Sequence, residues 1–185
     1  ILFCDIRGFT RFAESNPPDD VIAMLAGYQR RMVPVIQRHG GTIDKFMGDG
    51  IMATFGAVAP SETHAADALR AIDALMEASD AWNAERSGRG LSELRIGASA
   101  VSGRIVFGAV GDDSHLEYTV IGNAVNRAAK LEKATKEHKV RALTVRETYE
   151  AALVQGYAPP AEKEMRPGTP VDGIDGPADL VVMAG

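Results

Sequence analysis

The sequence predicts an α+β fold, in which a mainly antiparallel sheet packs against helices. Short runs rich in β-branched and aromatic residues flank Gly- and Asp-rich turns, which indicates hairpins and therefore antiparallel strands. Longer segments carry apolar residues at helical spacing on one side, which indicates helices that cover a sheet. With 185 residues, of which 45% are hydrophobic, the chain fits a single domain over 1–185 with one core.

The first elements are a strand and a helical segment. Residues 1–5 form a short apolar strand that stops at a turn. Prolines and acidic residues at 16–20 indicate a helix start, and apolar residues at helical spacing continue from there to His39. Pro34 lies inside this segment and is expected to kink or divide the helix, because proline removes a hydrogen bond and clashes with the preceding turn.

The remaining elements follow in order along the chain. They are a hairpin of 42–47 and 51–55, a helix over 61–86, strands over 94–101 and 105–110, a strand over 118–121, a helix over 123–136, a strand over 140–144, a helix over 146–153 and a closing strand pair. The strands on either side of Ser102-Gly103 are expected to pair with each other, and the helices are expected to cover one face of the sheet. This order predicts a ferredoxin-like βαββαβ core with a C-terminal αβ extension.

Charge and composition narrow the classes of function. The net charge of −5 argues against a nucleic-acid surface, but not against a small anionic ligand. The single cysteine excludes an internal disulfide and favours a reducing, cytoplasmic setting. No apolar run is long enough for a membrane helix, so we expect no membrane contact within this segment. The start in mid-strand suggests a domain cut from a longer protein, such as a membrane-attached or sensor-linked one.

Two aspartates are candidate metal ligands. Asp5 ends the first strand, and Asp49 lies in the turn Gly48-Asp49-Gly50. Each has an ordinary explanation as a turn residue. A ferredoxin-like sheet, however, places the first strand beside the central hairpin, so the two carboxylates should meet. Two carboxylates so close repel each other unless a divalent cation such as Mg²⁺ or Mn²⁺ lies between them.

The turn after Asp5 is a candidate phosphate site. Ile6, Arg7, Gly8, Phe9 and Thr10 form a strand-to-helix turn whose backbone N–H groups can point at an anion. Metal-binding carboxylates next to a phosphate cradle indicate metal-assisted phosphoryl chemistry on a nucleoside triphosphate.

Three stretches in order carry a family resemblance over essentially the whole chain. They are Phe3-Cys4-Asp5-Ile6-Arg7-Gly8-Phe9-Thr10, Lys45-Phe46-Met47-Gly48-Asp49-Gly50 and Gly122-Asn123-Ala124-Val125-Asn126. Together they resemble the catalytic domain of class III nucleotidyl cyclases. The resemblance implies that Asp5, Asp49 and the Ile6 carbonyl hold two divalent metals per active site, Mg²⁺ or Mn²⁺. It also implies attack of the ribose 3′-hydroxyl on the α-phosphorus, which yields a 3′,5′-cyclic nucleotide and pyrophosphate.

The same resemblance implies a base-reading pair. Lys45 and Thr119 align with the positions that contact the purine, where Thr119 can accept a hydrogen bond from the adenine 6-amino group. Guanylate-selective members tend to carry Glu and Cys at these two positions. Lys45 with Thr119 therefore points to ATP as the substrate. In the ordinary alternative, both are strand residues without a role in binding.

Two positions depart from the family pattern. Asn126 aligns with the asparagine that orients the ribose, but Lys130 stands where the family usually has a transition-state arginine. A lysine keeps the charge and loses the planar fork. Arg127 is expected on a different face of the helix and is therefore a poor substitute. The loop Asp112-Asp113-Ser114-His115 lacks the Lys or Arg that members often place there to grip the terminal phosphates.

In this family, the metal aspartates and the residues that contact base and ribose come from different subunits. The resemblance therefore implies a head-to-tail homodimer with two sites, and an inactive monomer. Adenylate cyclase is the leading hypothesis. The alternatives are a catalytically silent, nucleotide-binding regulatory module and a guanylate cyclase or broader triphosphate cyclase. A diguanylate cyclase would want Gly-Gly-Asp/Glu-Glu-Phe at the hairpin, and a polymerase would want a basic template channel, which the sequence lacks.

Overall fold

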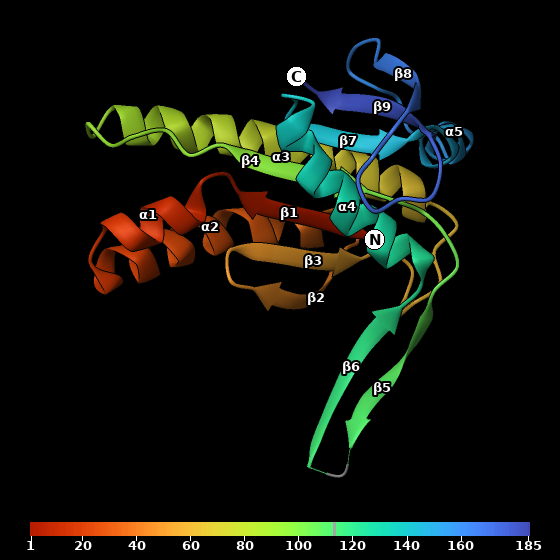
Figure 1. The fold of residues 1–185 in the computed structure, drawn as a ribbon, viewed down its shortest axis with the longest axis horizontal. Helices are drawn as coiled ribbons and strands as arrows, with labels where there is room; N and C mark the ends of the chain where they lie inside the picture. Colours follow the sequence, from red (N-terminus) through yellow and green to blue (C-terminus); the bar gives the residue numbers. More distant parts are fainter. Residues whose placement is uncertain (113) are drawn as a thin grey trace.

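A seven-stranded sheet with helices on both faces forms the body of the protein, and a two-stranded arm projects from it (Figure 1). The computed structural model describes residues 1–112 and 114–185. The strands of the main sheet follow the order β2-β3-β1-β4-β7-β9-β8, and only the β4–β7 pair is parallel. This architecture confirms the α+β prediction with a mainly antiparallel sheet.

The observed elements match most of the predicted ones within a few residues. They are β1 Leu2–Ile6, α1 Phe9–Ser15, α2 Pro18–Arg38, β2 Thr42–Met47, β3 Gly50–Thr54, α3 His64–Ser87, β4 Ile96–Ala100, β5 Val106–Asp112, β6 His115–Ile121, α4 Asn123–Glu137, β7 Ala142–Val145, α5 Arg146–Val154, β8 Glu164–Thr169 and β9 Ala178–Ala184. Pro34 lies inside the single helix α2 and does not divide it.

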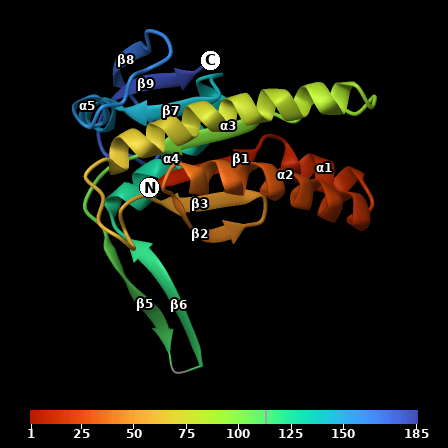
Figure 2. The same cartoon turned by 180° about the vertical axis from the view of Figure 1, so that it is seen from behind.

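The helices cover both faces of the sheet, so the prediction of a single covered face was wrong. Figure 1 shows α4 in front of the sheet, and the view from behind in Figure 2 shows α2 and α3 in front. Side chains alternate along β1 accordingly. Leu2, Cys4 and Ile6 are buried with α2 and α3, whereas Phe3 is buried with α4. The sheet therefore separates two cores, and α4 reaches one end of β1 from its own side.

The partner of β4 was also predicted wrongly. β4 pairs with β1 and β7, while β5 pairs with β6 in a separate hairpin. We call this hairpin, Val106–Ile121, the arm. The predicted loop after β5 is short, because β5 runs to Asp112 and β6 begins at His115. Of the predicted acidic loop, Asp113 lies outside the described residues.

The arm carries an unusual amount of exposed apolar surface. Its exposed large apolar side chains are those of Val106, Phe107, Val110, Leu116, Tyr118 and Ile121. The base of the arm contacts the main sheet where β6 approaches β2. No helix in the described part of the chain is both long enough and apolar enough to cross a membrane.

Candidate active site

The structure brings Asp5 and Asp49 together, as the sequence predicted. β1 pairs with β3 through Cys4 and Ile51, which puts the tip of the β2–β3 hairpin beside the end of β1. The backbone N–H of Ile6 donates a hydrogen bond of 3.0 Å to Asp49 Oδ2. The hairpin turn and the first strand therefore hold the two carboxylates at the same end of β1 and β3.

Both carboxylates line a pocket of about 590 Å³ between the β1–α1 turn and α4, which we call the carboxylate pocket. It is lined by Asp5, Ile6, Arg7, Gly8, Phe9, Thr10, Arg11, Asp49, Glu132, Lys133, Thr135 and Lys136. All the residues that the sequence predicted for metal binding and for the phosphate turn are in this set.

A third carboxyl group lies beside Asp5. Glu132 on α4 is only 9% exposed, and its carboxyl group lies close enough to that of Asp5 for a hydrogen bond between them. Gly97, opposite Asp5 on β4, leaves room for this contact, since a Cβ there would lie 2.5 Å from Glu132 Oε1 and 3.3 Å from Asp5 Oδ1. Two carboxyl groups can form such a hydrogen bond only when one of them carries a proton.

Burial raises the pKa of Asp5, Asp49 and Glu132. For Asp5, the nearby charge of Asp49 adds to the effect of burial. For Asp49, burial is the main cause. For Glu132, burial and the charge of Asp5 raise the pKa to about 8. None of the ion pairs among the described residues involves Asp5 or Asp49. Burial and mutual repulsion thus disfavour the charged forms of these carboxyl groups, and a bound cation would favour them.

The donor set fits a hard divalent cation that keeps part of its coordination for water and substrate. In the part of the chain that the structure describes, no three His, Cys, Asp or Glu side chains are arranged so that they could hold a metal ion by themselves. Mg²⁺ is commonly held by one or two carboxylates, with waters and substrate phosphates as the other ligands. Asp5 and Asp49, with the neighbouring backbone carbonyl of Ile6, would be the protein's oxygen ligands to such a cation.

Gly8 shapes the turn that follows Asp5. It precedes α1 with a φ of 76°, a conformation that favours glycine, and nothing lies within 4 Å of the place where a Cβ would be. The first backbone N–H groups of a helix have no acceptor within the helix. Phe9 and Thr10, at the start of α1, both line the carboxylate pocket.

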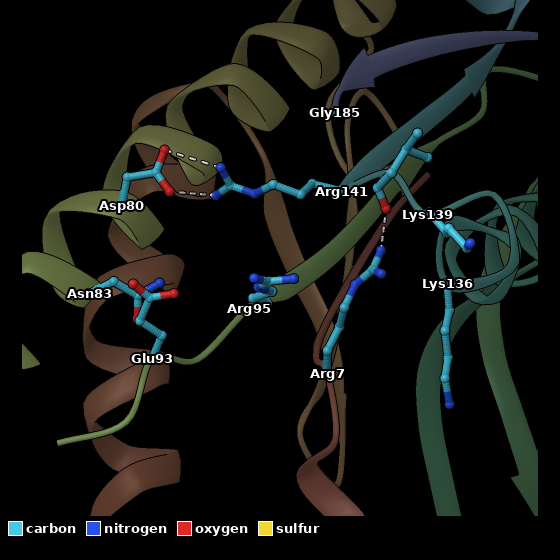
Figure 3. Close-up of a pocket in the computed structure, with 10 residues that line it drawn as sticks. Arg7, Asp80, Asn83, Glu93, Arg95, Lys136, Lys139, Arg141 and Gly185 are labelled. Carbon is cyan, nitrogen blue, oxygen red and sulfur yellow. Dashed lines mark hydrogen bonds and ion pairs between the residues drawn. The ribbon is translucent and has the colours of Figure 1, made fainter. Parts of the chain in front are cut away.

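Next to the carboxylate pocket lies a second pocket of about 610 Å³ with a cationic wall (Figure 3). Its cations are Arg7, Arg95, Lys136, Lys139 and Arg141. Of these, Arg141 is paired with Asp80 at 2.8 Å. Arg7 and Lys136 line both pockets, so positive charge continues from the carboxylates into the second pocket.

Arg7 lies at the boundary of the two pockets, where burial and neighbouring cations disfavour its charge. It donates a hydrogen bond to the carbonyl of Val140, but its buried Nε has no partner. Burial lowers the pKa of Arg7, and the charges of Arg95 and Arg141 lower it further, against the opposing effect of Glu132 and Asp5. An anion in the second pocket would relieve the repulsion among these guanidinium groups.

The two predicted base-reading residues meet at the base of the arm. Lys45 on β2 contacts Glu117 on β6 at 2.5 Å. Thr119 on β6 donates a hydrogen bond of 2.9 Å to Asp44 Oδ1 on β2. The hydrogen bond to Glu117 raises the pKa of Lys45, so this amine is charged at neutral pH.

Asn126 lines a third pocket of about 820 Å³, at the start of α4. Arg127 lines the same pocket. Asn126 and Lys130 are four residues apart and share one face of α4, whereas Arg127 directly follows Asn126 and points in another direction around the helix. Arg127 lies 3.9 Å from Glu147.

Lys130 packs against the loop between β8 and β9. A Cβ on Gly173 would lie 2.4 Å from Lys130 Nζ and 2.6 Å from its Cε. Gly173 has a φ of 74°, so the position favours glycine for two reasons. The side chain of Lys130 thus lies directly against Gly173 of the C-terminal extension.

The predicted site residues lie in three places in one chain, namely the carboxylate pocket, the base of the arm and the start of α4. Among the described residues, the lining of the carboxylate pocket includes neither Lys45 and Thr119 nor Asn126 and Lys130. Geometry alone therefore leaves the metal-binding group and the group predicted to contact base and ribose apart.

Reasoning from the sequence missed Glu132 and Asp44. A signal for Glu132 exists, since it lies at helical spacing with the buried Ala128 and Thr135, where an unpaired charge is out of place. No such signal marks Asp44, because its burial depends on the arm that folds against it.

Comparison with known proteins agrees with this geometry. The family described as "Adenylate and Guanylate cyclase catalytic domain" matches residues 1–167. An adenylate cyclase of Anabaena cylindrica is 39% identical over 142 residues, which are 75% of this chain and 27% of that protein. Adenylate cyclase 1 of Rhizobium meliloti is 36% identical over 137 residues, 74% of this chain and 21% of that protein. The chain thus spans less than a third of these relatives.

Solved structures show the same fold. The guanylyl cyclase Cya2 superposes with a TM-score of 0.82 at 30% identity, over 100% of this chain and 91% of that one. The adenylyl cyclase CyaB from P. aeruginosa gives a TM-score of 0.82 at 26% identity, over 97% and 90%. The carboxylate pair, the phosphate turn and these matches lead to one conclusion: the chain belongs to the family of adenylate and guanylate cyclase catalytic domains.

Proposed function

We propose that this domain is an adenylate cyclase, which forms 3′,5′-cyclic AMP and pyrophosphate from ATP at the interface of a head-to-tail homodimer. The observation that carries the proposal is the pair of half-buried carboxylates, Asp5 and Asp49, beside a cationic pocket of a size suited to phosphates. The named adenylate cyclases among the relatives support ATP as the substrate.

Asp5, Asp49 and the Ile6 carbonyl would hold two divalent cations, Mg²⁺ or Mn²⁺. When bound, such ions neutralise phosphate charge and lower the pKa of the attacking ribose hydroxyl. The backbone of Gly8, Phe9 and Thr10 would bind phosphate oxygens. Arg7 and Lys136 extend positive charge from there, so the triphosphate tail would lie toward the cationic wall in Figure 3.

The other half of the site would come from the partner. Lys45 and Thr119 would contact adenine, and Asn126 would orient the ribose. Lys130 would stabilise charge that develops on the α-phosphate as pyrophosphate leaves. Displacement at phosphorus depends mainly on position and charge neutralisation, so two rigid halves that close on the substrate suffice.

Two features support the homodimer. The metal-binding residues and Asn126 line different pockets of one chain, and the arm exposes six large apolar side chains. Exposed apolar surface of this kind marks an interaction site. A second copy docked under the arm would bury it and bring Asp5 and Asp49 of one chain to Asn126 of the other.

Mn²⁺-dependent cyclic AMP production by the domain tests the activity, with Asp49→Ala as the comparison. Loss of product in Asp49→Ala, with the fold retained, is the expected result. If the unmodified domain and Asp49→Ala are equally inactive while ATP still binds, a catalytically silent module is the correct interpretation. Lys130 in place of an arginine is the feature that favours that alternative.

Mixing of two inactive variants tests the shared site. Asp49→Ala and Asn126→Ala remove residues of opposite halves, so a mixed dimer retains one intact site. An equal mixture should recover about a quarter of the normal activity, since half of the dimers are mixed and each has one of two sites. No recovery after verified subunit exchange would show that one chain supplies both halves.

A further inference from the structure

A buried carboxylate joins the two base-reading residues. The side chain of Asp44 is only 3% exposed. Its Oδ1 accepts a hydrogen bond of 2.9 Å from the Thr119 hydroxyl, and Lys45 Nζ lies 3.7 Å from the same oxygen. The side chains of Lys45 and Thr119 therefore both lie near Asp44 Oδ1.

The backbone of β2 is irregular at this residue. In the pairing of β2 with β3, Ile43 is opposite Ala53 and Lys45 is opposite Met52, so Asp44 has no partner and forms a bulge. In a regular strand, Asp44 and Lys45 would point to opposite faces. A bulge redirects a side chain, and bulges are frequent beside active sites. Here the bulge lets neighbouring residues approach the same point on β6.

In the hydrogen bond between Thr119 and Asp44, only Thr119 can be the donor. A carboxylate can only accept, so Thr119 must donate its single hydroxyl proton to Asp44. The lone pairs of Thr119 Oγ1 remain, and they can only accept. The 6-amino group of adenine is a donor, whereas guanine has an acceptor oxygen at that position. An acceptor facing an acceptor leaves both groups unpaired, which is costly in a buried site.

We infer that Asp44 is a positioning residue that fixes Thr119 as a hydrogen-bond acceptor and so selects adenine over guanine. This inference rests on the proposed function, because it assigns the purine to Lys45 and Thr119. Asp44 itself does not touch the base. Without Asp44, the Thr119 hydroxyl can rotate and donate, and the site should accept either purine.

A purely structural role for Asp44 makes a different prediction. If Asp44 only ties the base of the arm to β2, its loss lowers stability or dimerisation and affects ATP and GTP alike. The ratio between the two nucleotides is thus the informative quantity. Polar groups that are left unpaired change such ratios by large factors, whereas general loosening does not.

The experiment measures kcat/KM for ATP and GTP with Mn²⁺ in the homodimer. Displacement of a fluorescent mant-ATP by ATP or GTP gives the same preference without chemistry. Asp44→Ala should lower the ATP/GTP ratio at least about tenfold, mainly by a gain with GTP. Asp44→Asn, which keeps the shape, should lower the ratio by at least about threefold, because an amide offers Thr119 either a donor or an acceptor.

A double substitution tests whether Asp44 acts through Thr119. In a Thr119→Val background, Asp44→Ala should leave the ratio unchanged, since no hydroxyl remains to orient. Asp67→Asn is the matched control, because Asp67 accepts a hydrogen bond of 2.7 Å from the Thr63 hydroxyl, and neither residue lines the carboxylate pocket. This control should keep the normal ratio.

The outcomes separate this inference from the proposed function. If the domain makes no cyclic nucleotide, the proposed function fails, and mant-ATP displacement still reports the preference. An unchanged ratio in both Asp44→Ala and Asp44→Asn overturns the inference, even with full cyclase activity. Absence of any ATP preference in the unmodified protein overturns it as well.

Discussion

The raised pKa of Glu132 gives a quantitative prediction for Glu132→Gln. In the folded protein without metal, Glu132 has a pKa of about 8, against 4.5 as its ordinary value. The folded state therefore keeps a proton that the unfolded state has released. This contribution to stability is fully present below about pH 4.5, and it is lost as pH rises through 8.

The magnitude follows from the same two pKa values. Between pH 6 and pH 8, one such group lowers the free energy of unfolding by about 2 kcal/mol. For a domain of this size, that corresponds to a fall in Tm of about 4–8 °C. Glutamine keeps the shape of Glu132 and donates to Asp5 at every pH, so the variant should lack this part of the dependence.

The assay is thermal unfolding in EDTA at several pH values, in the protein with and without Glu132→Gln. The difference in Tm between the two proteins cancels the titration of all other groups. The variant should gain stability relative to the unmodified protein as pH rises from 6 to 8. A difference in Tm that stays constant over this range would refute the raised pKa of Glu132.

Three further results are expected. Lys130→Ala should lower kcat far more than ATP affinity, because its charge matters mainly in the transition state, and equal losses in both would contradict that role. Gly173→Ala should displace the lysine and lower kcat, whereas Gly176→Ala, with a similar φ of 73° and open space around it, should cost only about 1 kcal/mol of stability. Cys4 is buried, hydrogen-bonded at 2.7 Å to Tyr28 Oη, and burial raises its pKa to about 12, so Ellman's reagent should leave it unmodified in the native protein at pH 8 and modify it after unfolding.

Local sequence patterns predicted the elements well but their partners poorly. The hairpin around Asp49 was predictable, because glycines and a short turn specify pairing between adjacent strands. The strand at β4 was also recognised, but its neighbour was not. The pattern of a strand indicates which of its side chains are buried, but not which strand it pairs with. β4 pairs with β1 and β7, which are distant in the sequence, whereas the next strand, β5, pairs with β6 in the arm.

The first strand with Asp5 near its end, the tight turn that carries Asp49 and the Gly8 turn before α1 were predictable from the sequence. They depend on short-range backbone preferences and on the chemistry of neighbouring residues. The buried position of Glu132 beside Asp5, and the bulge that brings Asp44 to Thr119, emerged only from the folded chain. Both depend on burial by distant segments, because the cost of a buried charge and the direction of a hydrogen bond are set by neighbours in space.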